Sequence, residues 1–193
     1  MGRGVILSAV GGLFCLLVVV VVGWALVAYN RLVRQRNQVQ ASWAQIDVQL
    51  KRRYDLIPNL VETVKGYAAH ERGTLEAVVA ARTGAIAAAA TPGVADRADA
   101  ENILTQALGR LFALAEAYPD LKANQNFAAL QRELANTEDK IAYARQFYNS
   151  AVQTFNTSVQ SIPTNLIAGL GGFRAMDFFE ALDGERASVQ VRF

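Results

Sequence analysis

The single histidine of the chain, His70, is where any histidine-dependent chemistry would have to occur. A Ser-His-Asp triad or a histidine-ligated zinc site would need it. The segment His70-Glu71-Arg72-Gly73-Thr74 lacks the second histidine of a zinc metalloprotease helix. We therefore interpret His70 as a solvated residue and expect no catalytic residue, no metal and no cofactor. A pair of catalytic carboxylates stays open from sequence, but a narrow helical bundle offers no cleft for one.

A basic triplet, Lys51-Arg52-Arg53, is the second feature that could carry a function. One interpretation is a ladder of solvated ion pairs, because Asp47, Lys51 and Asp55 are spaced four residues apart on a helix. The other is a docking patch for a partner protein, and all three basic residues are kept as candidates for it. Nucleic-acid binding is not expected, since the formal net charge is only +2.

Residues 5–28 form an uninterrupted run without a charged side chain. At about 1.5 Å per residue, such a helix is roughly 36 Å long and crosses a hydrocarbon core of about 30 Å. The alternative is a cleaved signal peptide with Arg3 in its basic region. The apolar region of a signal peptide is typically only about 7–15 residues long, so we predict a transmembrane helix.

Basic residues follow the apolar run more densely than they precede it. Arg31, Arg34 and Arg36 lie just beyond its end, whereas Arg3 alone precedes it. The three arginines are close enough to contact lipid headgroups, and their excess predicts a cytoplasmic main domain with the N-terminus outside. The one cysteine, Cys15, lies inside the run, which excludes an intrachain disulfide and agrees with a reducing compartment.

The rest of the chain has the apolar spacing of long helices, with alternating steps of three and four residues. This is the heptad pattern of helices that pack in a coiled-coil-like manner. After the membrane segment the pattern falls on Val39, Trp43, Ile46, Leu50, Ile57, Val61, Val64 and Ala68. In the last long segment it falls on Phe127, Leu130, Leu134, Thr137, Ile141, Ala144, Tyr148, Ala151, Phe155 and Ile162. Between them, one broad face carries Ile103, Leu104, Ala107, Leu108, Leu111, Leu114 and Ala115.

These patterns predict the organisation of the chain. Its parts are a short N-terminal peptide with the transmembrane helix at 1–28, a helical bundle at 29–162, and a glycine- and phenylalanine-rich tail at 163–193. The predicted bundle helices cover about 29–90, 94–117 and 124–162. The first bends at Pro58 or continues there as an end-to-end segment, because proline removes a backbone donor. The expected fold is all-α, an N-terminal transmembrane helix followed by an elongated antiparallel helical bundle with coiled-coil-like heptads.

Four asparagines form a candidate polar layer. Asn30 and Asn37 are seven residues apart in the first helix, and Asn149 and Asn156 are seven apart in the last. If the last helix returns antiparallel to the first, both pairs come to a similar height, where buried asparagine would fix the helix register. Simple exposure to solvent is the alternative.

The tail is dense in apolar residues and ends in a strand-like alternation. Its candidate partner-docking residues are Phe173, Met176, Phe178, Phe179, Val189, Val191 and Phe193. Arg174 is the one cation near the phenylalanines, which disfavours a basic amphipathic helix that adsorbs to lipid. The tail is then disordered, folded back on the bundle, or added to a sheet of another chain. We favour docking on another chain, because residues this apolar are costly to expose.

The sequence also contains several long motifs. They are YNRLV at 29–33, SWAQIDVQLKRRYDLIPNLV at 42–61, VKGY at 64–67, AEAYPDLKAN at 115–124 and ARQFYN at 144–149. In this order, from about residue 29 to the end, they closely resemble the LemA family of bacterial membrane proteins. The resemblance implies a single-pass protein of the bacterial cytoplasmic (inner) membrane, with a short N-terminal peptide outside and a helical bundle inside. It implies no reaction, because the family has no established one.

Two classes of function follow from these observations. We expect a membrane-anchored, non-catalytic scaffold or adaptor whose bundle mediates self-assembly or binds another envelope protein. The alternative is a regulator or subunit of a membrane-protease complex, or an enzyme of unrecognised type. The expected partners are the lipid bilayer and either a second copy or another membrane protein, with no nucleic acid and no small-molecule substrate.

Overall fold

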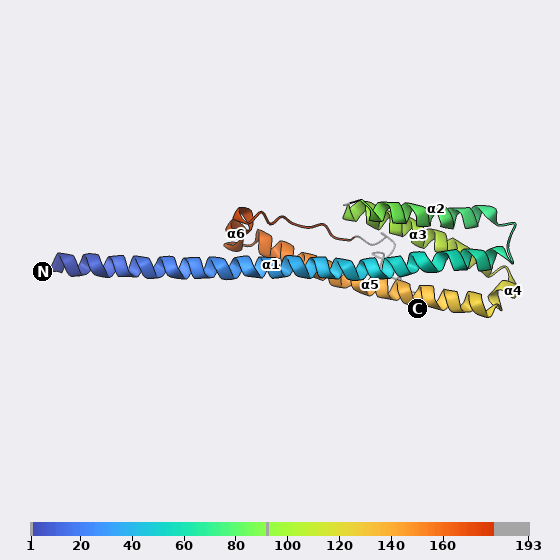
Figure 1. The fold of residues 1–193 in the computed structure, drawn as a ribbon, viewed down its shortest axis with the longest axis horizontal. Coiled ribbons are helices and arrows are strands. Elements are labelled where there is room, and N and C mark those ends of the chain that lie inside the picture. Colours follow the sequence, from blue (N-terminus) through green and yellow to red (C-terminus); the bar gives the residue numbers. More distant parts are fainter. Residues whose placement is uncertain (1, 92, 180–193) are drawn as a thin grey trace, which may run out of the picture. The chain divides into compact units, whose positions relative to one another are not determined.

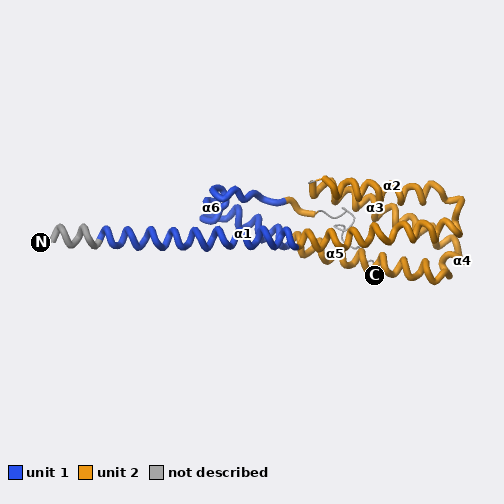
Figure 2. Tube along the Cα trace, viewed as in Figure 1, with its two compact units in different colours: residues 1–41, 150–176 blue, residues 42–149, 177–193 orange. Residues whose placement is uncertain are grey.

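The computed structural model describes residues 2–91 and 93–179, and the regular structure in that part of the chain is helical (Figure 1). The helices are α1 (Gly2–Lys65), α2 (Arg72–Ala89), α3 (Val94–Ala115), α4 (Pro119–Lys122), α5 (Gln125–Gln160) and α6 (Thr164–Leu170). Two compact units divide the chain, with residues 1–41 and 150–176 in unit 1 and residues 42–149 and 177–193 in unit 2 (Figure 2). The predicted all-α fold class is confirmed.

The first part of α1 has the properties that the apolar run predicts. Among the described residues, α1 is the one helix that is long and apolar enough to cross a membrane. Its large apolar side chains between Val10 and Val27 are exposed. Such exposure is costly in water and favourable in hydrocarbon. Burial in the protein begins only at the end of the run, where Ala28 is covered.

α1 continues past the position at which the sequence predicts a bend. The helix runs through Pro58 and ends at Lys65, and the chain turns at residues 66–71 before α2 begins. The prediction of a helix over 29–90 that bends at Pro58 is therefore wrong in the place of the break. Main-chain hydrogen bonds to the Val64 carbonyl oxygen close α1 at the true break.

A hydrogen bond from α2 explains why α1 tolerates a proline. Pro58 has no N–H, so the carbonyl oxygen of Tyr54, four residues earlier, loses its helical donor. The Nε atom of Arg82 in α2 donates a hydrogen bond to that oxygen at 2.8 Å. Because a carbonyl group withdrawn from water needs a donor, this contact replaces the missing bond and ties α2 to α1 within unit 2.

The core of unit 2 is built largely from the predicted apolar positions. Among its fully or nearly buried side chains are Ile46, Leu50, Ile57 and Val64 of α1, Leu104 and Leu111 of α3, and Phe127, Leu134 and Ile141 of α5. Leu60, Val78 and Leu121 are also fully buried, although the pattern did not include them. Contacts of Trp43 with Tyr148 and of Arg52 with Glu133 show that α1 and α5 are antiparallel here. The pattern fails at Ile103, which is exposed on α3.

One asparagine starts α5 and holds a turn in place. The side-chain oxygen of Asn124 accepts hydrogen bonds from the main-chain N–H groups of Asn126 and Phe127, at 2.8 and 3.0 Å. These are two of the donors that a helix N-terminus leaves unpaired. Its amide nitrogen donates to the Tyr67 hydroxyl at 2.9 Å. The turn after α1 is thereby joined to the beginning of α5.

Unit 1 has a smaller core, which the end of α6 completes. Its buried side chains include Ala28, Leu32, Val39, Val152, Phe155, Ala168 and Phe173. The main-chain N–H of Phe173 donates to the Ala168 carbonyl at 2.9 Å, and the N–H of Gly172 donates to the Gly169 carbonyl at 3.3 Å. Gly172 has φ +68°, the left-handed conformation in which a helix commonly ends. The chain therefore leaves α6 in a defined direction.

We predict that the Arg82 contact matters only while residue 58 is proline. Arg82→Met should lower the free energy of unfolding by about 1 kcal/mol, because a carbonyl loses its donor. In a Pro58→Ala background the N–H of residue 58 supplies that donor, so the same substitution should cost clearly less. Denaturant unfolding of the four proteins of this double-mutant cycle, followed by circular dichroism, measures the difference. An equal cost in both backgrounds would contradict the explanation.

Candidate functional site

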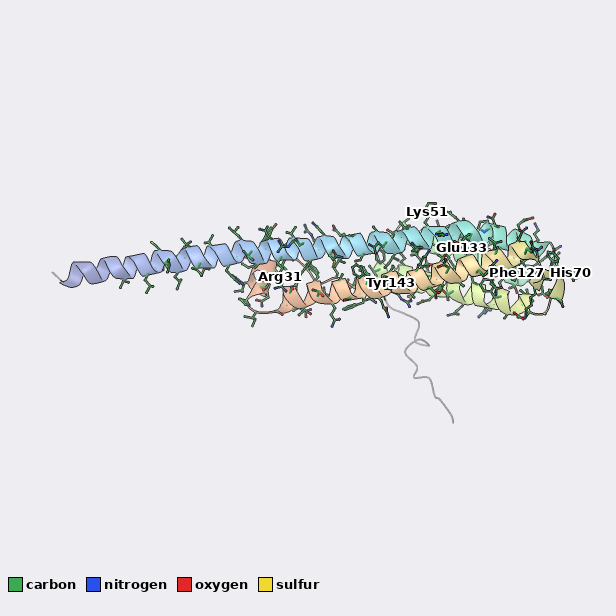
Figure 3. All side chains as sticks on the ribbon, turned by 90° about the horizontal axis from the view of Figure 1, so that it is seen from below. Arg31, Lys51, His70, Phe127, Glu133 and Tyr143 are labelled. Atoms are coloured by element: carbon green, nitrogen blue, oxygen red, sulfur yellow. The ribbon has the colours of Figure 1, made fainter. Side chains whose placement is uncertain are left out.

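The basic triplet is divided between the surface and the interior of unit 2. Lys51 is exposed and pairs with Asp55 at 2.9 Å, as the spacing predicts, and Arg52 pairs with Glu133 of α5. Arg53, by contrast, has only 2% of its surface exposed. Its place as a partner-docking candidate is therefore corrected. Figure 3 shows Lys51 on the outer side of α1.

The buried guanidinium of Arg53 is held by α3 and α5. It donates to the Thr105 hydroxyl of α3 at 2.7 Å and lies 3.0 Å from a carboxylate oxygen of Glu138 in α5. A carboxylate oxygen of Glu101 in α3 is 3.8 Å away. A signal for this burial was present in the sequence, since residue 53 lies three after Leu50 and four before Ile57, in the phase of the apolar seam.

Glu101 is buried and accepts a hydrogen bond from the Tyr54 hydroxyl. Burial raises the pKa of Glu101 above its usual range, and it outweighs the hydrogen bond from Tyr54 and the attraction of Arg53 and Arg97, which lower it. The other carboxylate oxygen has no hydrogen-bond partner. Burial also raises the pKa of Tyr54, and the carboxylate of Glu101 raises it further. Both shifts therefore disfavour the ionised forms of Glu101 and Tyr54.

A second buried arginine extends this cluster toward the aromatic end of unit 2. Arg97 of α3 forms an ion pair with Asp47 of α1. Its guanidinium carbon lies 5.1 Å from the centre of the Trp43 ring, within the range of a cation–π interaction. The charged groups of the cluster thus neutralise one another and join α1, α3 and α5, which is the arrangement of a structural network.

Histidine and metal chemistry find no assembled site in the described chain. His70 is exposed in the turn between α1 and α2 (Figure 3). Within residues 2–91 and 93–179, no three His, Cys, Asp or Glu side chains are grouped to hold a metal ion.

Asparagine side chains hold the tail against α5, each within one unit. In unit 1, the Asn156 amide donates to the Met176 carbonyl and accepts from the Met176 N–H, both at 2.8 Å. In unit 2, Asn149 makes the same pair of bonds with Phe179, at 3.0 and 2.9 Å. Seven helical residues and three extended residues both cover about 10 Å. The seven-residue spacing of the two asparagines in α5 therefore matches the three-residue spacing of Met176 and Phe179 in an extended segment.

The predicted asparagine layer is wrong. Asn30 and Asn37 are exposed on α1, whereas Asn149 and Asn156 bind main-chain groups of the tail. The main-chain N–H and C=O of one residue offer a donor and an acceptor, so they satisfy a side-chain amide as completely as a second asparagine would. The seven-residue spacing was informative, but it did not reveal the partner.

Phe173 and Phe179 are buried against the chain that carries them, so their assignment as partner-docking residues is corrected. In unit 1, Phe173 lies 5.5 Å from Tyr29 and 6.3 Å from Phe155, measured between ring centres. In unit 2, Phe179 lies 5.7 Å from Trp43. Folding back was therefore the correct alternative for this stretch, because aromatic pockets on the same chain were available.

The remaining tail candidates differ in their accessibility. Met176 is half-buried and Phe178 is exposed. Val189, Val191 and Phe193 lie outside the described residues.

The three arginines after the membrane run are all exposed on α1. The guanidinium carbon of Arg36 lies 5.2 Å from the centre of the Phe173 ring in unit 1. A cation above an aromatic face is attracted to it, so Arg36 also helps to hold the tail. Arg31 and Arg34 make no comparable contact with a ring in the described part of the chain.

Unit 2 also has an open groove between α1 and α5. Its volume is about 600 Å³, and its lining includes Ala44, Val48 and Gln49 of α1 and Asp139, Lys140 and Tyr143 of α5. Val48 and Tyr143 are 63% and 72% exposed, although both are large and mostly apolar. Tyr143 projects from α5 in Figure 3. Gln49 adds a buried carbonyl oxygen that has no hydrogen-bond partner.

Comparison with known proteins agrees with this architecture. Residues 42–193 match the family model described as the LemA family. The matched region contains the second part of α1 and all later helices, and it includes most of the motifs that carry the resemblance.

Three relatives cover most of the chain. Magnetosome protein MamQ 2 of Paramagnetospirillum magneticum is 28% identical over 203 residues, which cover 93% of this chain and 74% of that protein. Magnetosome protein MamQ of Magnetospirillum gryphiswaldense is 28% identical over 177 residues, covering 80% and 65%. Protein LemA of Metamycoplasma hominis is 27% identical over 164 residues, covering 84% and 73%.

We predict that Glu101 makes stability depend on pH. A carboxyl group with a raised native pKa stabilises fully below its unfolded value, here 4.5, and this contribution is lost as pH rises through the native pKa. Glutamine has no such proton to lose. Glu101→Gln should therefore gain stability relative to the native protein as pH rises from about 4 toward neutrality.

Thermal unfolding at several pH values measures this difference. Glu62→Gln is the matched control, because Glu62 is highly exposed. A stability difference between Glu101→Gln and the native chain that does not vary with pH would show that Glu101 does not titrate as expected.

We also predict that Asn156 is required to hold the tail. Asn156→Leu removes both bonds to Met176, so the Met176 amide should exchange its hydrogen faster, and unfolding should cost roughly 1–2 kcal/mol less. Asn37→Leu, at an exposed asparagine of α1, should stay within about 0.5 kcal/mol of the native chain. Hydrogen exchange with mass spectrometry follows the tail directly. Unchanged protection of Met176 in Asn156→Leu would disprove the clamp.

Proposed function

This chain is a membrane-associated member of the LemA family, and we propose that it is a non-catalytic scaffold that assembles with a second copy of itself in the bacterial inner membrane. The observation that carries the proposal is the groove of unit 2. Its two large, exposed side chains, Val48 and Tyr143, occupy a surface that a monomer in water would normally keep polar. The charged side chains in the interior of unit 2 pair with one another. This supports a role in recognition, rather than in a reaction, for the groove between α1 and α5.

The chemistry of the groove favours a second copy as its occupant. Asp139 and Lys140 lie side by side on it with opposite charges, and neither forms an ion pair within the described chain. A face that carries both signs around an apolar centre is complementary to itself across a two-fold axis. The unpaired oxygen of Gln49 supplies an acceptor for a donor from the other copy. A shared bilayer keeps the copies close together.

The orientation in the membrane is part of the same proposal. Arg31, Arg34 and Arg36 follow the apolar run, and an excess of basic residues favours the cytoplasmic side. We infer that the short N-terminal peptide is outside and that the chain beyond the membrane helix is cytoplasmic.

Photo-cross-linking in native membranes tests the scaffold. A photoreactive residue at Tyr143 of the full chain should give an adduct of twice the chain mass that contains only this protein. The same residue at Val79, which is exposed on α2, should not. An adduct with one other identified membrane protein would instead support an adaptor, and the absence of any protein adduct at Tyr143 would argue against both.

Charge substitutions test the self-complementarity of the groove. Each single substitution, Asp139→Lys or Lys140→Asp, leaves charges of only one sign at positions 139 and 140. Like charges of the two copies then repel each other, so the adduct should decrease several-fold. The double variant Asp139→Lys with Lys140→Asp restores both signs and should restore the adduct. Equal adduct formation in all four proteins would show that this edge does not face a second copy.

A further inference from the structure

The exposed face of α6 has no polar side chain. Leu166 and Leu170 of α6 have 65% and 89% of their surfaces exposed, and Ile162, in the turn before the helix, has 83%. At 100° per residue, Leu166 and Leu170 lie about 40° apart on the helix. Pro163, which precedes the helix, and Gly169 are also exposed and nonpolar. Ala168, on the opposite side, is buried.

Such a face is unusual for a helix in water. A surface helix normally exposes charged or polar residues opposite its buried side. Contiguous exposed apolar side chains mark a contact surface. In the described structure nothing covers these three side chains, so the question is which surface they meet.

The position of α6 on α1 indicates the bilayer. A Cβ atom at Gly171, the residue that follows α6, would lie 3.1 Å from the Tyr29 ring. The ring of Phe173, two residues further, lies 5.5 Å from the centre of the Tyr29 ring. Tyr29 directly follows the uncharged run of residues 5–28. Within unit 1, the end of α6 therefore lies where α1 leaves its apolar segment.

The residues around this position have the composition of a membrane boundary. Trp24 and Tyr29 are partly exposed there, and tryptophan and tyrosine are enriched at the level of the lipid headgroups. Arg31 and Arg34 are exposed just beyond it and can attract anionic headgroups. These cations come from α1, so α6 needs no basic residues of its own. The shortage of cations in the tail, which disfavoured a lipid contact from sequence, does not apply to the folded unit.

We propose that α6 and the turn before it form a second membrane contact, in which Ile162, Leu166 and Leu170 insert into the headgroup and acyl boundary of the bilayer that α1 crosses. A short helix that lies in the boundary buries its apolar face without leaving backbone groups unpaired. The contact is continuous with the membrane helix, because Gly171 and Phe173, which follow α6, lie against Tyr29. It holds the membrane-proximal end of unit 1 at two points. It does not depend on the proposed self-assembly.

Fluorescence in lipid nanodiscs tests this contact. The full chain, with Cys15→Ser and a single cysteine introduced by Leu166→Cys or Leu170→Cys, is labelled with an environment-sensitive dye. It is placed at one chain per disc in phosphatidylcholine and phosphatidylglycerol. Val79→Cys on α2 is the matched control, because Val79 is also exposed. Circular dichroism verifies that each labelled protein is folded.

The dye at both α6 positions should emit at shorter wavelength than at Val79. Lipids with a quencher near the headgroup should reduce its intensity several-fold and leave the control unchanged. Quenching at α6 by aqueous iodide, as at the control, would mean that the face is in water and would overturn the proposal. Resistance to both quenchers would mean that protein covers the face, and would overturn it equally. Because each disc holds one chain, the result is independent of whether copies assemble.

Discussion

A guanidinium group that leaves water needs hydrogen-bond acceptors and opposite charges close to it, and at Arg53 this requirement joins three helices of unit 2. The group comes from α1, its hydroxyl acceptor Thr105 from α3, and its carboxylate partner Glu138 from α5. Apolar seams alone specify register weakly, since a shift of one heptad again brings apolar residues together. A shift would leave the Arg53 charge buried without a partner, which is strongly unfavourable. The cluster therefore selects one register from those that the seams allow.

The helices themselves were largely predictable, because periodicity reports which side of a helix is buried. The predicted segments 94–117 and 124–162 correspond to α3 and α5, and most of the predicted seam positions are buried. The burial of Arg53 was not predicted, because its charge was given more weight than its position in the heptad pattern. The break at Pro58 was misjudged for another reason. Its compensation comes from Arg82 in another helix, and no local pattern links these two positions.

The tail shows where prediction from sequence ends. Asn149 and Asn156 were recognised as a pair with a meaningful spacing, but an amide side chain makes the same two bonds with another amide side chain and with the main-chain N–H and C=O of one residue. Only the fold distinguishes these partners. Main-chain recognition of this kind depends little on the side chains of the bound segment. The position of the tail segment along α5 therefore depends on the aromatic contacts of Phe173 and Phe179.

The exposed apolar residues of this chain fall into groups that lie in different parts of the sequence, and each group needs its own apolar environment. Those between Val10 and Val27 belong to the uncharged run, and the end of α6 lies near Tyr29, directly after that run, because Gly171 is placed against the Tyr29 ring. Val48 lies 20 residues beyond Ala28, the end of the uncharged run, and charged residues such as Asp47 and Lys51 flank it. This part of the sequence lacks the long uncharged run that a membrane segment requires. The groove of Val48 and Tyr143 must therefore be covered by protein or remain in water, and the cost of the second state favours a protein partner.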